Sequence, residues 1–164
     1  MYKEILKNIK YRDFKSSTPF LSLNELSRVG SYSCFEAAAK AYLILFENNI
    51  TDCEFLTLER KNIKNPNDIL GHIIIIYQDK GFYGSIGLSR YDNLSSFNPI
   101  FKTKEKLIKE YIKNYYQKGF IVDKFGLINF NEVNDLKLDL LRNKEDMKKL
   151  HDYLISKYHY SVTL

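Results

Sequence analysis

Residues 71–90, GHIIIIYQDKGFYGSIGLSR, constrain the fold more than any other stretch of this sequence. A run of four isoleucines and a second apolar segment lie on either side of Asp79-Lys80-Gly81, a pattern typical of a β-hairpin with a tight turn. We therefore expect two antiparallel strands, over about 70–77 and 82–88. A strand that served only to fill a core would not need a histidine at its start or a serine and an arginine after its partner.

The turn predicts which side chains meet. A turn centred on Lys80-Gly81 places His72 opposite Ser89, and a register shifted by one or two residues places it opposite Leu88 or Gly87 instead. Side chains directly opposed across two strands have Cβ atoms about 4.5–5.5 Å apart. We expect Ser89 to reach the imidazole through its hydroxyl or a nearby backbone carbonyl, with Arg90 at the same end of the sheet.

The remaining pattern predicts an α+β fold, because a helix precedes the strands and further helices follow them without βαβ alternation. We expect one domain over residues 1–164, with a central antiparallel sheet. The expected helices span about 3–10, 21–29, 34–46, 102–119 and 144–158, and further strands span about 53–60 and 120–133.

Composition indicates the cellular compartment and the kind of partner to expect. The N-terminal segment has charges every few residues and no apolar core typical of a signal peptide, and no apolar run is long enough to span a membrane. Only two cysteines are present, so a disulfide scaffold is not expected and a reducing, cytoplasmic setting is the default. The formal net charge of +5 favours an anionic partner.

Cys34 stands where the strongest predicted helix begins. Ser33-Cys34-Phe35-Glu36 matches a capping box, which makes Cys34 the first helical residue. The helix dipole is expected to lower the pKa of its thiol and to favour the nucleophilic thiolate. Simple packing of a small apolar residue is the alternative interpretation, and it is the one we adopt for Cys53.

A cysteine nucleophile needs a base, and His72 is the best of three histidines. His151 and His159 fall in the C-terminal helix or tail, where we expect them to face solvent. A structural role for His72 near a strand end is the alternative. Neither cysteine has the histidine spacing typical of a zinc site, so we expect no metal and no cofactor.

The segments CFEAAAKAYL and GHIIIIYQDKGFYGSIGLSRYDNL resemble the vasohibins, transglutaminase-like cysteine peptidases that remove the C-terminal tyrosine from α-tubulin. The vasohibin pattern is a Cys-Leu-Glu-Ala helix start, then Arg-His-Ile-Val, then Gly-x-Tyr-Gly-x-x-Gly-x-Ser-Arg and an acidic Asp-Leu. The clear match covers about residues 34–47 and 71–120. It implies a transglutaminase-like, papain-related fold.

The resemblance also implies roles for single residues. Cys34 would be the nucleophile, His72 the general base, Ser89 the third member of the triad and Arg90 the residue that grips a terminal carboxylate. Tyr11 is the best match for a tyrosine that helps at the oxyanion.

Two positions depart from the vasohibin pattern. A lysine precedes the cysteine and an arginine precedes the histidine in vasohibins, and here these are Ser33 and Gly71. Vasohibins bind a small helical partner protein through a long N-terminal region, which is largely missing here, so the need for such a partner stays open.

Residues 102–118 form a basic helix with interleaved tyrosines. This helix could attract an acidic C-terminal tail, as on tubulin, whereas no nucleic-acid motif supports binding to DNA or RNA. A solvated helix face is the plain alternative. We therefore expect a cysteine carboxypeptidase that acts on an acidic tail. A transglutaminase-like acyltransferase and an inactive binding module of the same fold are the rivals.

Overall fold

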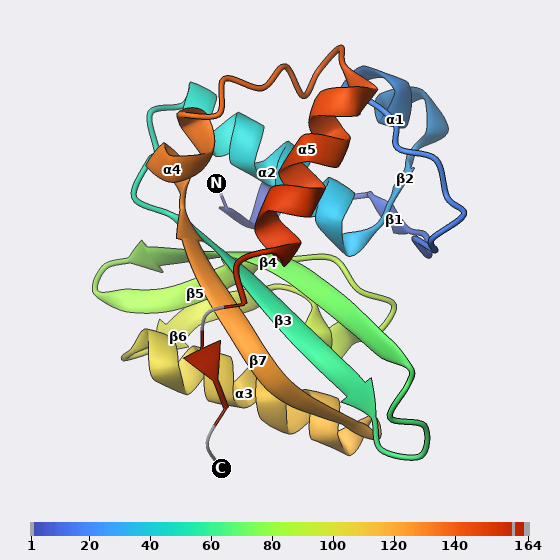
Figure 1. Ribbon diagram of the computed structural model, residues 1–164. Helices are drawn as coiled ribbons and strands as arrows, with labels where there is room; N and C mark the ends of the chain where they lie inside the picture. The colour runs from blue at the N-terminus through green and yellow to red at the C-terminus, as the bar shows by residue number, and fades with distance from the viewer. Residues whose placement is uncertain (1, 159, 163–164) are drawn as a thin grey trace.

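The computed structural model describes residues 2–158 and 160–162. A six-stranded sheet forms the centre of the protein, with strand order β6-β5-β4-β3-β7-β8 and antiparallel pairing between neighbours. Helices α2 and α5, together with α1 and α4, lie on one face of the sheet, and α3 lies on the other (Figure 1). The expectation of an α+β protein with a mainly antiparallel sheet is confirmed.

The helices are η1 (Tyr2–Glu4), α1 (Leu23–Val29), α2 (Cys34–Glu47), η2 (Asp92–Leu94), α3 (Lys104–Gln117), α4 (Phe130–Asn134) and α5 (Lys144–Ile155). The strands are β1 (Lys10–Tyr11), β2 (Ser31–Tyr32), β3 (Glu54–Asn62), β4 (Ile69–Asp79), β5 (Phe82–Ile86), β6 (Phe97–Phe101), β7 (Phe120–Asn129) and β8 (Tyr160–Ser161).

The central hairpin has the predicted turn. Lys80 and Gly81 both have positive φ, at 50° and 86°, as a two-residue turn that follows the natural twist of the strands requires. The ladder runs from Asp79↔Phe82 to Ile75↔Ile86, which is the register centred on Lys80-Gly81. The pairing with β5 stops there, so the part of β4 that carries His72 pairs only with β3, where His72 lies opposite Leu58.

Two hydrophobic clusters fill the two faces of the sheet, because alternate residues of a strand point to opposite sides. Ile73, Ile75 and Tyr77 of β4 belong to the cluster beneath α2 and α5. Ile74 and Ile76 belong to the cluster beneath α3. His72 is an even number of residues from Ile74 and Ile76, so its side chain points to the same face of the sheet as theirs. Its ring centre lies 5.8 Å from that of Tyr115 on α3.

Four predicted elements differ from the structure. The strand predicted over 120–133 ends at Asn129, and Phe130–Asn134 form helix α4. Residues 3–10 do not form a helix: only the η1 turn is helical, and β1 pairs in parallel with β2, where no strand was predicted. The segment between Arg90 and residue 102, for which no element was predicted, contains β6, whose Pro99 is tolerated because β6 is an edge strand. Helix α5 ends at Ile155, so Tyr158 lies beyond it.

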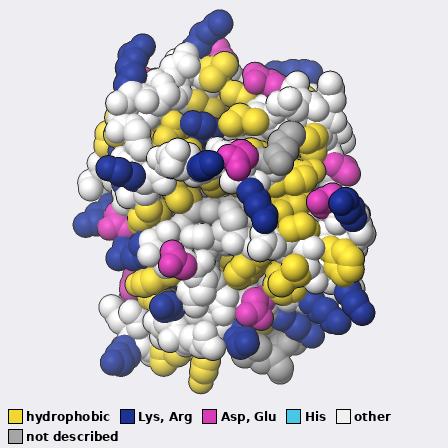
Figure 2. Space-filling model, turned by 180° about the vertical axis from the view of Figure 1, so that it is seen from behind, with side chains coloured by type: hydrophobic (Ala, Val, Ile, Leu, Met, Phe, Trp, Pro, Cys, Tyr) yellow, Lys and Arg dark blue, Asp and Glu magenta, His cyan; other side chains and the backbone are white. Residues whose placement is uncertain are grey.

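The helices built from residues 2–158 and 160–162 are too short or too polar for any of them to serve as a membrane span. Seen from behind, Lys and Arg side chains are spread over the surface, and several of them lie along the lower part of the molecule (Figure 2).

Candidate active site

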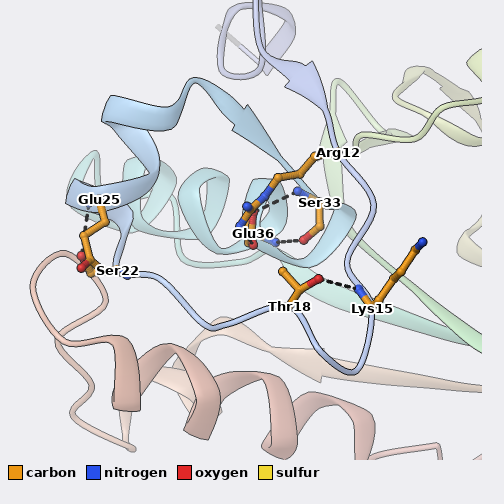
Figure 3. Close-up of polar contacts among 7 residues, drawn as sticks. All are labelled: Arg12, Lys15, Thr18, Ser22, Glu25, Ser33 and Glu36. Atoms are coloured by element: carbon orange, nitrogen blue, oxygen red, sulfur yellow. Dashed lines mark hydrogen bonds and ion pairs between the residues drawn. The ribbon is translucent and has the colours of Figure 1, made fainter.

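The start of α2 is held by a network that fixes Cys34 in place. Ser33 is the N-cap, its hydroxyl accepts a hydrogen bond from the Glu36 backbone N–H, and the Glu36 carboxylate accepts one from the Ser33 N–H. The capping box is therefore confirmed. Arg12 donates two hydrogen bonds to this carboxylate, at 2.6 and 3.2 Å (Figure 3). Glu36 is only 1% exposed, and the paired arginine neutralises its charge beside the helix start.

Cys34 is partly exposed, but its thiol does not have the lowered pKa that its position predicts. Burial raises the pKa of Cys34 above its ordinary value, although hydrogen bonds from the backbone of Ile73 and Phe35 act in the opposite direction. The loss of hydration outweighs the helix terminus here. The expectation of a lowered pKa at Cys34 is therefore wrong.

His72 lines the same pocket as Cys34 and is buried there. Its side chain is 3% exposed, and its Nε2 lies 2.9 Å from the backbone carbonyl oxygen of Leu94. A carbonyl oxygen only accepts, so Nε2 carries the proton and Nδ1 is left as the basic nitrogen. Burial lowers the pKa of His72 to about 4, and the nearby Arg60 charge adds to this effect. The ring is therefore neutral at pH 7 and able to accept a proton.

Ser89 lies beyond the strand pairing on which its prediction depended. The strand register is the predicted one, but β5 ends at Ile86, three residues before Ser89. The Ser89 hydroxyl instead accepts a hydrogen bond from the Tyr91 backbone N–H at 3.2 Å. Within residues 2–158 and 160–162, no hydrogen bond joins Ser89 to His72, and the orienting contact comes from Leu94.

Helix α3 fixes the segment that presents the Leu94 carbonyl. Asn114 donates a hydrogen bond to the carbonyl of Asn93 at 2.6 Å, and the Tyr111 hydroxyl donates one to the carbonyl of Ser95 at 2.6 Å. Both neighbours of Leu94 are thus tied to buried side chains of one helix. The contact between Leu94 and His72 therefore depends on the position of α3.

The site residues predicted from the sequence line one pocket of about 190 Å³, which we call the Arg90 pocket. Its lining includes the five predicted residues, Tyr11, Cys34, His72, Ser89 and Arg90. Arg90 forms an ion pair with Asp13, and its guanidinium lies 5.9 Å from the Tyr11 ring centre. Burial raises the pKa of the Tyr11 hydroxyl, and negative charge on Cys34 would raise it further, which reflects how near the two groups lie.

Arg60 is a second cation in the Arg90 pocket that the sequence did not reveal. A bulge in the β3–β7 pairing falls between Glu59 and Arg60, and bulges often redirect side chains beside active sites. The Arg60 guanidinium stacks 3.8 Å from the Phe120 ring centre. Its Nη1 is buried and has no hydrogen-bond partner among the described residues. An unmatched positive charge of this kind favours an anionic ligand in the pocket.

A larger cavity of about 430 Å³ lies next to the Arg90 pocket and is also lined by Cys34. We call it the Phe35 pocket. His151 lines it, with its ring 5.0 Å from that of Phe35, so the expectation that His151 faces solvent is wrong. The interpretation of His159 lies outside the described residues.

Cys53 is 2% exposed and lies in the core cluster, as its structural interpretation predicts. Within residues 2–158 and 160–162, no group of three or more His, Cys, Asp or Glu side chains is placed to hold a metal ion.

A helix-start cysteine and a strand histidine line the same pocket, and a Cys–His nucleophile needs these two groups. This geometry defines the protein as an α+β protein with a candidate thiol site. A comparison with protein families matches residues 22–145 to the vasohibin family. The match spans most of the chain, so the protein belongs to the vasohibin family, and this membership supports a peptidase related to tubulin modification at the family level. No match was found among individually curated proteins.

Proposed function

We propose that this protein is a cysteine carboxypeptidase of vasohibin type, which removes one residue from the C-terminus of a peptide chain. One observation carries the proposal: Cys34, His72 and Arg90 line a single pocket. A nucleophile, a base and a carboxylate-binding cation are the three groups that this reaction requires. The enclosing fold is proposed to be transglutaminase-like and papain-related, with α2 delivering the cysteine to a sheet that carries the histidine.

The first half of the proposed reaction forms a thioester. His72 Nδ1 accepts the proton of the Cys34 thiol as the sulfur attacks the scissile carbonyl carbon. The Cys34 backbone N–H at the helix start and the Tyr11 hydroxyl stabilise the oxyanion. The protonated His72 then gives its proton to the leaving amine, and the C-terminal residue departs.

In the second half, water gives a proton to His72 and attacks the thioester, which releases the shortened peptide and returns the proton to Cys34. The Leu94 carbonyl is proposed as the orienting third group, because it accepts the hydrogen bond from His72 Nε2. Ser89 is then proposed to have an indirect role: its hydroxyl accepts a hydrogen bond from the Tyr91 N–H and so stabilises the conformation of residues 89–91.

Arg90 is proposed to bind the terminal carboxylate of the substrate, with Arg60 as a second cation. Arg90 is paired with Asp13 in the absence of substrate, and its exposed guanidinium can exchange that partner for a substrate carboxylate through two parallel hydrogen bonds. Arg60 compensates for the absence of a lysine at Ser33.

The proposed substrate is a protein with an acidic C-terminal tail, of which α-tubulin is the example suggested by the family. A net charge of +5 supports attraction of such a tail. At the C-cap of α3, the ammonium of Lys118 lies 4.8 Å from the ring centre of Tyr91, which lines the Arg90 pocket. Lys104 at the other end of α3 is paired with Glu54 and is less available.

The test uses two peptides of identical sequence, one with a free C-terminal carboxylate and one with a C-terminal amide, analysed by mass spectrometry. The free acid should lose its last residue and the amide should not. Cys34→Ala should abolish cleavage, and Arg90→Gln should slow cleavage of the free acid to the rate of the amide. Equal cleavage of both peptides by the wild-type protein would rule out a carboxypeptidase.

A further inference from the structure

The Phe35 pocket lies directly beside the proposed nucleophile. It has a volume of about 430 Å³, within the range typical of small-molecule and side-chain binding sites. Cys34, Leu70 and Gly71 line both this pocket and the Arg90 pocket. The two cavities therefore meet at Cys34, and a peptide bound across this residue would enter both of them.

The walls of the Phe35 pocket are mainly aromatic and aliphatic. Phe14 and Phe35 flank the His151 ring at 5.7 and 5.0 Å, and Ile155 and Tyr158 complete the side formed by the C-terminal segment. Aromatic rings at such spacings attract further aromatic rings in edge or offset contact. A ring from a substrate would extend this cluster.

The charges in the lining do not favour an acidic side chain. Lys15 and Glu59 are the lysine and the carboxylate among the lining residues, and they have opposite signs. Neither belongs to an ion pair among residues 2–158 and 160–162. A substrate carboxylate in this pocket would meet one exposed ammonium group and one repelling carboxylate, whereas the Arg90 pocket offers two arginines, Arg60 and Arg90.

Local contacts position two segments of the pocket wall. A Cβ atom at Gly71 would lie 2.9 Å from the Tyr158 hydroxyl, so glycine allows this tyrosine to approach the strand. The segment after Phe14 closes on itself, because the Lys15 backbone N–H donates to the Thr18 hydroxyl and the Thr18 N–H donates to the Lys15 carbonyl, at 3.0 and 2.9 Å (Figure 3).

We propose that the Phe35 pocket is the acyl-side subsite of the enzyme, and that it takes an apolar, preferably aromatic, side chain from one of the two residues that precede the scissile bond. The proposal rests on the proposed function for two points: Cys34 is the nucleophile, and the C-terminal carboxylate occupies the Arg90 pocket. The acyl part of the substrate must then lie on the opposite side of Cys34. Acidic residues farther from the scissile bond remain in solvent.

The test uses peptide chloromethyl ketones, which occupy the acyl side and need no C-terminal carboxylate. The thiolate of Cys34 attacks the methylene carbon, a thioether forms and chloride leaves. Acetyl-Phe-Phe, acetyl-Ala-Ala and acetyl-Glu-Glu chloromethyl ketones are compared by the rate of Cys34 modification, each divided by its rate with glutathione. The Phe-Phe reagent should react at least about tenfold faster than both others, as burial of an aromatic side chain predicts.

A pair of lysine substitutions provides the control. Ile155 lines the pocket and is 37% exposed, whereas Ile100 on β6 is 69% exposed and lines neither pocket. Ile155→Lys should reduce the preference for Phe-Phe over Glu-Glu about tenfold, and Ile100→Lys should leave it unchanged. Equal rates for Phe-Phe and Ala-Ala, or no modification of Cys34 by any reagent, would overturn the proposal.

The result is separable from the carboxypeptidase test. Selective labelling by Phe-Phe without release of a C-terminal residue from any peptide would support the subsite and contradict the carboxypeptidase. Release of a C-terminal residue without selective labelling would support the carboxypeptidase and contradict the subsite.

Discussion

The Nε2 atom of His72 lies 2.9 Å from the backbone carbonyl oxygen of Leu94. This hydrogen bond fixes the tautomer of the ring and leaves Nδ1 as the nitrogen that can take a proton. The orienting group of the candidate site is thus a backbone atom, and its position depends on the side chains of α3 that hold Asn93 and Ser95.

Tyr111→Phe tests this dependence. The substitution keeps the ring but removes the hydrogen bonds to the Ser95 carbonyl and to Ser85, and each buried bond is worth about 0.5–1.5 kcal/mol. We expect kcat/KM for peptide cleavage to fall about tenfold at a temperature where the variant remains folded. Tyr153→Phe is the matched control, because it removes a tyrosine hydrogen bond to Glu132 outside both pockets. Equal effects of the two variants would count against the role of α3.

Ser89→Ala separates the serine from the carbonyl. The Ser89 hydroxyl accepts a hydrogen bond from the Tyr91 N–H, so its loss should lower kcat/KM by less than about tenfold. His72→Ala removes the base itself and should cost about 100-fold or more. Steady-state kinetics of both variants provide the comparison. A decrease in kcat/KM for Ser89→Ala as large as that for His72→Ala would show that Ser89, and not the Leu94 carbonyl, is the third member of the triad.

The low pKa of His72 predicts that acid destabilises the protein. The pKa is about 4 in the folded protein and 6.5 for an unperturbed histidine, so the unfolded chain takes up the proton first as the pH falls. The stabilisation is complete above pH 6.5 and is lost progressively between pH 6.5 and 4. From pH 7 to pH 5 this amounts to about 2 kcal/mol.

Urea unfolding at pH 7 and pH 5 measures this loss. His72→Gln cannot titrate but can still donate to the Leu94 carbonyl, so it should lose about 2 kcal/mol less than the wild-type protein over the same range. An identical loss in both proteins would mean that His72 is not a buried neutral histidine.

The two cysteines should differ sharply toward iodoacetamide. Cys34 is partly exposed, whereas Cys53 is buried and burial raises the pKa of its thiol to about 12. We expect labelling of Cys34 alone in the native protein and of both residues in urea, as read by peptide mapping. Because burial also raises the pKa of Cys34, its labelling rate should climb about tenfold per pH unit between pH 7 and 9. A rate that is flat over this range would reveal a preformed thiolate.

Features set by neighbouring residues were predictable from the sequence. The capping box joins Ser33 to Glu36 three residues later, and the Lys80-Gly81 turn fixes the register of the hairpin because its strands are adjacent in the chain. The hairpin pattern also predicted His72 and Arg90 at one end of the sheet, and the resemblance to vasohibins implied that Cys34 joins them.

Features set by distant residues were not predictable. The Leu94 carbonyl is a backbone atom positioned by α3, which has no signature at Leu94 itself. Arg60 looked like an ordinary strand residue, and its place in the pocket depends on a bulge against β7. The pKa of Cys34 depends on burial by the folded chain, which outweighs the helix start that the sequence shows. His151 was predicted on the solvent-facing side of the C-terminal helix. Its ring instead packs near Phe14 and Phe35, which come from the N-terminal third of the chain.

The most direct measurement of the central claim, that Cys34 forms a thioester with the substrate, is cleavage of a free-acid peptide in the presence of hydroxylamine. A thioester is captured by this amine, so part of the peptide shortened by one residue should appear as its hydroxamate in mass spectra. The hydroxamate and the acid should both be absent with Cys34→Ala. A shortened peptide that appears only as the acid, and that persists with Cys34→Ala, would contradict a thiol mechanism at this site.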